Sequence, residues 1–213
     1  MTRPWGRSTV GISDSRTQAE RTAATREALL TAGRALFGER GYADVGTEEV
    51  VRKAGVSRGA LYHHFADKAE LFTAVLESVE EMVNARITAA MTTAGPDDPI
   101  GAMRLGTAAF LDFCVEPGMA RIILIDGPAV LGAQAWSEAS NNEIAATVQL
   151  INHGIELGRI PPQPAEPLAR ILLGALNQAA LYIAAAADPA AARDEVGAAL
   201  NGIIESVATS GRT

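Results

Sequence analysis

Residues 47–68 read TEEVVRKAGVSRGALYHHFADK, and their pattern decides the fold class. A polar residue at Thr47 predicts the cap of a short helix, which Gly55 breaks. Ser57 is in position to cap a second helix of about two turns, residues 58–64. Because two short helices joined by a glycine-containing turn form a helix-turn-helix, the sequence predicts this unit here.

The second helix has the surface that a DNA-reading helix requires. Such a helix lies in the major groove, so its outward residues need to be small, polar or basic. Gly59 and Ala60 let the backbone approach base edges, and Arg58 can make a bidentate contact with guanine that is worth about 1–3 kcal/mol of discrimination. Other side chains can donate to phosphates, which sets register without reading sequence. They are Thr47, Tyr62, His63 and Lys68.

The flanking sequence predicts further helices and no strand, which indicates an all-α fold. A first helix is expected over about residues 21–40, ending at Gly41. Asp67 and Glu70 have the spacing of a capping box, which predicts the start of a long helix that reaches about Met91.

These motifs resemble the DNA-binding domain of TetR-family transcriptional regulators. The likeness rests on AGVS at residues 54–57, LYHHF at 61–65 and DKAEL at 67–71, and it extends back to Leu36. It covers about a quarter of the chain. The resemblance implies phosphate contacts by Thr47, Tyr62, His64 and Lys68, and base contacts by Arg58, Gly59, Ala60 and His63. Ser57 belongs to the same expected DNA-binding set.

The resemblance also implies the domain layout. An N-terminal three-helix helix-turn-helix DNA-binding domain, residues 21–66, is expected to precede a larger helical effector-binding and dimerisation domain, residues 67–213. Residues 1–20 are expected to form a disordered tail, because they show no apolar periodicity.

The family implies two partners besides DNA: a second copy of the chain and a small-molecule effector. The homodimer is expected through about residues 166–208, two antiparallel helices in which small residues such as Gly174 and Ala179 permit close approach. A two-fold dimer presents its recognition helices about 34–36 Å apart to palindromic double-stranded DNA. An effector would release a repressor of this kind by stabilising a dimer whose spacing does not match the grooves.

The expected effector cavity lies among the helices after Ile100. Its walls require apolar side chains with few polar groups, although each apolar candidate is also a candidate for the core. Asn177 and Gln178 are polar within an otherwise apolar helix and are the expected orienting groups. The remaining candidates are Met103, Phe110, Phe113, Cys114 and Trp136.

The net charge of −7 argues against a nucleic-acid partner for the chain as a whole, but the charge is unevenly placed. Residues 1–65 hold ten Lys and Arg against seven Asp and Glu, whereas the rest hold eight against eighteen. A polyanion is therefore expected to meet the N-terminal portion. Glu48 and Glu49 depart from this pattern, and Glu48 either accepts from cytosine N4 or is a solvated or capping glutamate.

Several classes of protein are disfavoured by composition. A single cysteine in 213 residues excludes an internal disulfide framework and a multi-cysteine zinc site. No catalytic constellation, cofactor loop or metal-ligand spacing is predicted, since His63 and His64 are neighbours that point about 100° apart on a helix. The N-terminus lacks an apolar leader, so a cytoplasmic protein is expected, and the charge-free stretch 171–187 is interpreted as a buried helix and not a membrane span.

Two alternatives stay open at this point. An all-helical enzyme or ligand-carrying bundle could hold a site that is assembled only in space. A DNA-binding architectural or corepressor module would keep the helix-turn-helix and need no cavity. A cavity among the later helices discriminates the effector-responsive regulator from the second alternative.

Overall fold

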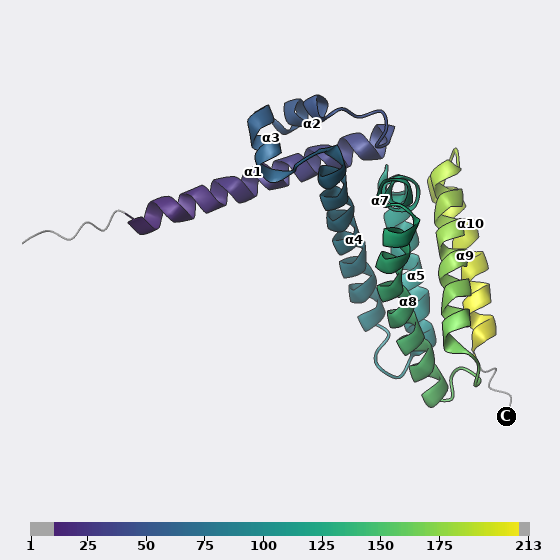
Figure 1. Ribbon diagram of the computed structural model, residues 1–213. Helices are drawn as coiled ribbons and strands as arrows, with labels where there is room; N and C mark the ends of the chain where they lie inside the picture. The colour runs from purple at the N-terminus through teal and green to yellow at the C-terminus, as the bar shows by residue number, and fades with distance from the viewer. Residues whose placement is uncertain (1–10, 209–213) are drawn as a thin grey trace, which may run out of the picture.

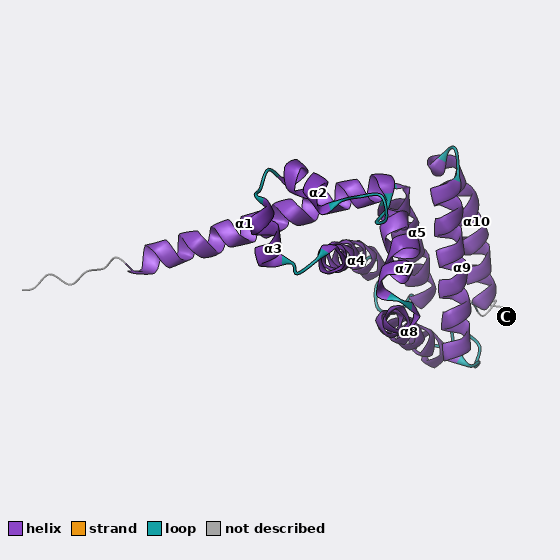
Figure 2. Ribbon diagram, turned by 45° about the horizontal axis from the view of Figure 1, so that its top comes forward, coloured by secondary structure: helices purple, strands orange, loops and turns teal. Residues whose placement is uncertain are grey.

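The computed structural model describes residues 11–208, which form helices joined by short loops and contain no strand (Figure 2). The prediction of an all-α fold is confirmed. The helices are α1 (Gly11–Arg40), α2 (Thr47–Ala54), α3 (Arg58–His64), α4 (Lys68–Thr92), α5 (Pro99–Val115), α6 (Met119–Arg121), the π-helix η1 (Ile122–Asp126), α7 (Gly127–Leu131), α8 (Ala133–Glu156), α9 (Ala165–Ala185) and α10 (Pro189–Val207).

The predicted helix-turn-helix is formed by α2 and α3, which pack on α1 (Figure 1). Gly55 ends α2 in the left-handed conformation, and the Ser57 hydroxyl accepts a hydrogen bond from the Ala60 amide at 3.1 Å. The predicted cap at Thr47 is wrong, because Gly46 precedes the helix and Thr47 is its first residue. Gly46 has the extended backbone of a cap but no side chain, so no side-chain cap hydrogen bond is formed there.

The first helix is longer than its sequence pattern suggests. The structure places residues 11–20 in α1 instead of a tail, and this end of α1 projects away from the rest of the molecule (Figure 1). Residues 17–20 are exposed, so backbone hydrogen bonds and helix-favouring residues support the helix there without a packed face. The remainder of the expected tail, residues 1–10, lies outside the described residues.

The start of α4 joins the N-terminal unit of α1, α2 and α3 to the bundle. The Asp67 carboxylate accepts from the Glu70 amide at 2.9 Å, and the Glu70 carboxylate accepts from the Ala66 amide at 2.6 Å. The predicted cap of α4 at Asp67 is confirmed. In a standard capping box the Glu70 carboxylate would accept from the amide of Asp67, whereas here it accepts from the amide of the preceding residue, Ala66. Phe72 in the first turns of α4 packs edge-on against Phe37 and Tyr42, with ring centroids 5.3 and 5.1 Å apart.

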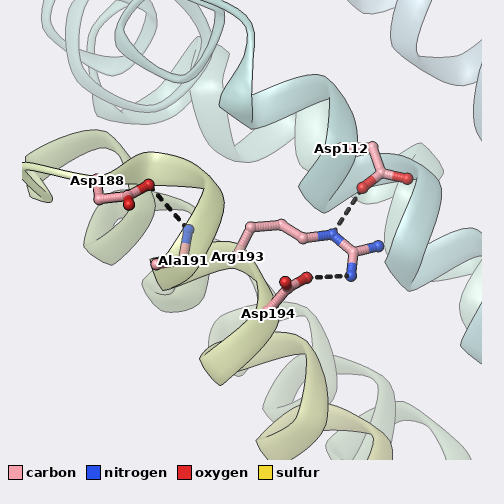
Figure 3. Close-up of polar contacts among 5 residues, drawn as sticks. All are labelled: Asp112, Asp188, Ala191, Arg193 and Asp194. Carbon is pink, nitrogen blue, oxygen red and sulfur yellow. Dashed lines mark hydrogen bonds and ion pairs between the residues drawn. The ribbon is translucent and has the colours of Figure 1, made fainter.

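In the larger domain α4, α5, α8, α9 and α10 form a bundle, with α9 and α10 at the edge farthest from the projecting end of α1 (Figures 1 and 2). Arg193 ties α10 to α5, because its Nε donates to Asp112 at 2.6 Å (Figure 3). That hydrogen bond is the main reason why the pKa of Arg193 is raised. Asp188 caps α10 by accepting from the Ala191 amide at 3.0 Å.

One face of α9 is not covered by the rest of the described chain. By length and composition alone this helix could cross a membrane, yet it packs against α5, α8 and α10 on its other side. Ile171 is 67% exposed and Tyr182 is 52% exposed. The interpretation of this stretch as a buried helix is therefore wrong for the single chain.

Candidate DNA-binding surface and effector cavity

The recognition helix α3 presents one side to solvent and buries the other. Leu61 is fully buried, and Phe65, four residues later, is buried beside it. Arg58 and Tyr62 are themselves four residues apart, so they share one face of α3, and this face is turned to solvent. The Arg58 side chain is 66% exposed and Tyr62 is 44% exposed. The basic side chain that is expected to read guanine is thus free to meet a groove.

Arg58, Tyr62, Thr47 and Glu48 form one polar group across α2 and α3. The Arg58 guanidinium lies 3.3 Å from the Glu48 carboxylate and 5.6 Å from the centre of the Tyr62 ring. Hydrogen bonds to Thr47 and Arg58 lower the pKa of Tyr62, and the bond to Thr47 contributes most. Glu48 therefore holds Arg58 in the absence of DNA. An exposed ion pair of this kind is weak, so a phosphate or base can replace the carboxylate.

Other predicted DNA contacts are held more closely by the protein. The Lys68 ammonium lies 4.1 Å from the centre of the Tyr42 ring and donates to the Ala43 carbonyl at 3.5 Å. His64 is half-buried, and this burial lowers its pKa, with smaller contributions from His63 and Arg26. His63 itself is exposed.

The small residues at the tip of α3 leave space above the helix. A Cβ atom built on Gly59 would have only the Ser57 hydroxyl within 4 Å, at 3.9 Å. The packing of the described chain therefore does not require glycine at this position. A close approach by a partner such as DNA would explain why this position has no side chain.

Glu49 has a structural partner. Its carboxylate lies 2.5 Å from the Arg40 guanidinium, which joins the end of α1 to the first turn of α2. This carboxylate is engaged within the domain and lies at a helix N-terminus, where negative charge is favourable.

A cavity of about 130 Å³ lies among α4, α5, η1, α8 and α9. Phe110, Ile123, Leu124 and Trp136 supply its apolar surface. Its polar lining consists of Glu80, Asn84, Ser140, Asn142, Glu143 and Asn177. Apolar walls with convergent polar groups are the usual composition of a small-molecule site.

Three of the residues predicted for an effector site line this cavity: Phe110, Trp136 and Asn177. The other four lie elsewhere. Met103 belongs to a second apolar cluster with Ile151 and Ile160, and Gln178 is exposed on α9. Phe113 and Cys114 are buried in the main core.

Cys114 has the properties of a buried apolar residue. It is only 4% exposed, and burial raises the pKa of its thiol to about 12. Because the thiolate is the reactive form, this environment opposes redox chemistry at neutral pH.

Two acidic residues of the cavity, Glu80 and Glu143, are not among the residues predicted from sequence. Burial raises the pKa of Glu80, and the nearby negative charges of Glu143 and Glu77 raise it further. Glu143 is exposed at the edge of the cavity, but neighbouring protein atoms still raise its pKa by desolvation. The available signal was helical spacing: Glu80 lies four residues after the buried Leu76.

A larger depression of about 480 Å³ lies on the loop between α4 and α5, beside Arg159. Loop residues 94–98 form most of its surface, so helices do not enclose it as they enclose the first cavity. None of the described residues that line it is aromatic. Within residues 11–208, no three His, Cys, Asp or Glu side chains are grouped so as to hold a metal ion.

An exposed recognition helix on a small N-terminal domain, followed by a cavity-bearing helical bundle, defines a helix-turn-helix protein of the transcriptional-regulator class. The family model for bacterial regulatory proteins of the tetR family matches residues 29–75, and that for the tetracyclin repressor-like C-terminal domain matches residues 100–207. The chain belongs to the TetR family, whose members are transcriptional regulators and not enzymes.

Individual relatives agree with this assignment. A solved TetR-family transcriptional regulator from Pectobacterium atrosepticum is 33% identical, with a TM-score of 0.75 over 91% of this chain and 98% of its own. The HTH-type transcriptional regulator CymR of Pseudomonas putida is 40% identical over 46% of this chain, and the transcriptional activator FasR of Mycolicibacterium smegmatis is 39% identical over 41%. The matches span 49% and 39% of these two relatives.

Proposed function

We propose that this protein is a cytoplasmic, sequence-specific repressor that binds a palindromic operator as a homodimer and is released by a small-molecule effector. The observation that carries the proposal is the outward face of α3, where Arg58 and Tyr62 are exposed beside the small residues Gly59 and Ala60. In this proposal Arg58, Gly59, Ala60 and His63 meet bases. The other predicted contacts position α3 on the phosphate backbone of the DNA. They are made by Thr47, Ser57, Tyr62, His64 and Lys68.

The uncovered face of α9 and α10 supports the proposed homodimer through about residues 166–208. Ile171 and Tyr182 are exposed on α9, and Ile203 is 43% exposed on α10. A Cβ atom built on Gly174 or Gly202 would meet no atom within 4 Å, so a second copy can approach closely there. Covering these apolar side chains by the same face of another copy removes them from water and gives the two-fold symmetry that a palindrome requires.

The cavity supports the effector-responsive mechanism. It is enclosed by α4, which starts next to α3, and by η1, which contacts α1. A ligand that binds differently to two arrangements of these helices shifts their populations by that difference in affinity.

The proposed function is tested by DNA binding of the full chain to a palindromic fragment from its own upstream region. We expect two protomers per palindrome and binding that weakens steeply between 50 and 200 mM salt, because phosphate contacts release counterions (about 10³-fold or more for six or more such contacts). Equal affinity for a scrambled fragment of the same composition would contradict sequence-specific recognition. Titration with unrelated DNA at each salt concentration provides the control.

A further inference from the structure

The polar side of the cavity carries two carboxylates, and none of the described residues that line it is a cation. Glu80 projects from α4 and Glu143 from α8, and both line the same space. Neither forms an ion pair with any residue between 11 and 208. The other charged group that acts on Glu80 is Glu77, which is also acidic.

The remaining polar groups of the cavity are neutral. Asn84, Asn142 and Asn177 each offer an amide, and none of the three side chains hydrogen-bonds to another part of the described chain. The Ser140 hydroxyl is already used, because it donates to the Trp136 carbonyl at 3.0 Å. The described lining of the cavity thus offers negative charge and free amides, and it includes no positive group to receive an anion.

The apolar side of the cavity contains two aromatic rings. Trp136 enters from α8 and Phe110 from α5. Aromatic faces attract cations that lie within about 6 Å, and tryptophan does so most strongly. The rings also pack against flat apolar groups by offset or edge contacts.

We propose that the effector cavity selects a small organic cation with an aromatic body, held by Glu80 and Glu143 and packed against Trp136 and Phe110. The inference rests on the proposed function only in treating this cavity as the effector site. A cation is favoured because it lets both carboxylates ionise without facing each other uncompensated, whereas an anion would add a third negative charge. The volume of about 130 Å³ is sufficient for one aromatic ring. Asn84, Asn142 and Glu143 are exposed, so the cavity is open to solvent on this polar side and the cationic group can extend beyond it.

A matched pair of probes tests the charge requirement. Benzyltrimethylammonium carries a fixed positive charge, and neopentylbenzene has the same shape without it. We expect calorimetric titration of the full chain at pH 7.5 and constant ionic strength to give at least about tenfold tighter binding of the cation, which corresponds to one well-placed charge interaction.

Isosteric variants assign the charge preference to the two carboxylates. Glu80→Gln and Glu143→Gln are each expected to weaken binding of the cation by about tenfold or more and to leave neopentylbenzene unaffected. Glu81→Gln and Glu138→Gln are the matched controls, since these exposed residues lie on the same two helices outside the cavity. The controls are expected to bind the cation like the native chain.

The pH dependence follows from the direction of the pKa shifts. Desolvation raises the pKa of both cavity carboxyls, and the nearby negative charges of Glu143 and Glu77 raise that of Glu80 further, so acidification protonates them earlier than ordinary glutamates. Affinity for the fixed cation is expected to fall as the pH is lowered through this raised range, and the fall is expected to be smaller in either Gln variant. Binding of neopentylbenzene should stay constant.

Thermal unfolding without ligand gives a second readout. A carboxyl whose pKa is raised in the folded state stabilises the fold when protonated and loses that contribution as the pH rises. Glu80→Gln is therefore expected to raise the Tm at pH 7.5, with a gain that shrinks toward pH 4. Glu81→Gln should show no such trend.

The outcomes separate this inference from the proposed function. Equal binding of both probes, absence of cation binding, or equal losses in the control variants would overturn the cation-selective cavity. Operator binding measured on the same sample without probe reports on the proposed function alone. A chain that binds its operator but shows no preference for the cation keeps the function and loses the inference.

Discussion

The backbone amide of Tyr42 donates a hydrogen bond to the Asp126 carboxylate at 3.0 Å, across 84 residues of sequence. Tyr42 follows the end of α1 in the DNA-binding domain, and Asp126 is the last residue of the π-helix η1. Ile123 and Leu124 of the same π-helix line the cavity. One short element therefore contacts both the proposed effector site and the DNA-binding domain, and π-helical turns are frequent at functional sites.

Replacing Asp126 by Ala is expected to loosen this connection. Loss of the acceptor leaves the Tyr42 amide unpaired, which costs about 1–2 kcal/mol in the free energy of unfolding. Urea denaturation measures that loss, and hydrogen exchange should show faster exchange of the Tyr42 amide. Asp126→Asn keeps a carbonyl acceptor and is expected to lose less. Unchanged exchange at Tyr42 in the Ala variant would show that the contact does not order the junction.

A second contact at the same junction depends on glycine. Gly118 has φ +82°, and a Cβ atom there would lie 2.4 Å from the Gly38 Cα in α1. Gly118→Ala is expected to cost about 1–2 kcal/mol for the left-handed backbone alone, and more for the clash. Gly158→Ala is the matched control, because φ is +67° and no atom lies within 4 Å of the Cβ position. Equal losses of unfolding free energy in both variants would contradict close packing of α1 against the turn between α5 and α6.

The proposed roles of Arg58 and Lys68 predict different defects in DNA binding. Arg58→Ala is expected to relax base preference at one position, at a cost of about 1–3 kcal/mol on the best sequence. Lys68→Ala should weaken binding to all sequences alike and reduce the salt slope by about one. Binding-site selection with each variant distinguishes the two. Identical defects from both substitutions would contradict the assigned roles.

The uncovered face of α9 predicts a charge-sensitive dimer. Ile171→Asp is expected to place a carboxylate in the proposed interface and shift sedimentation toward the monomer, because a buried unpaired charge is unfavourable. Leu157→Asp changes another exposed apolar residue, 40% exposed at the end of α8 and outside residues 166–208. That control should remain dimeric. An unchanged sedimentation profile for Ile171→Asp would place the interface elsewhere.

Local signals allowed the DNA-binding domain to be predicted well. Ser57, Gly55 and Asp67 act within a few residues of their own position, so their capping and turn roles are visible in sequence. Thr47 was misassigned because a polar residue resembles a cap whether or not the preceding backbone already fulfils that role. The start of α1 was missed because an exposed helix lacks the apolar periodicity on which the prediction depended.

The cavity was predicted only in part, because helices distant in sequence assemble it. Phe110 and Phe113 lie on the same helix and look equivalent in sequence, yet Phe110 lines the cavity and Phe113 is enclosed by the core. Their difference depends on where α8 and α9 pack against α5. Glu80 and Glu143 face the same space from helices whose proximity no local pattern reveals.

Hydroxyl-radical footprinting of the full chain on its palindromic operator tests the central claim most directly. Two copies of α3 that act together are expected to protect two half-sites on one face of the duplex, about 10 base pairs or a multiple of that apart. Arg58→Ala should weaken both protected sites equally. Protection of a single site, or uniform protection without that spacing, would contradict a dimeric protein that reads DNA through α3.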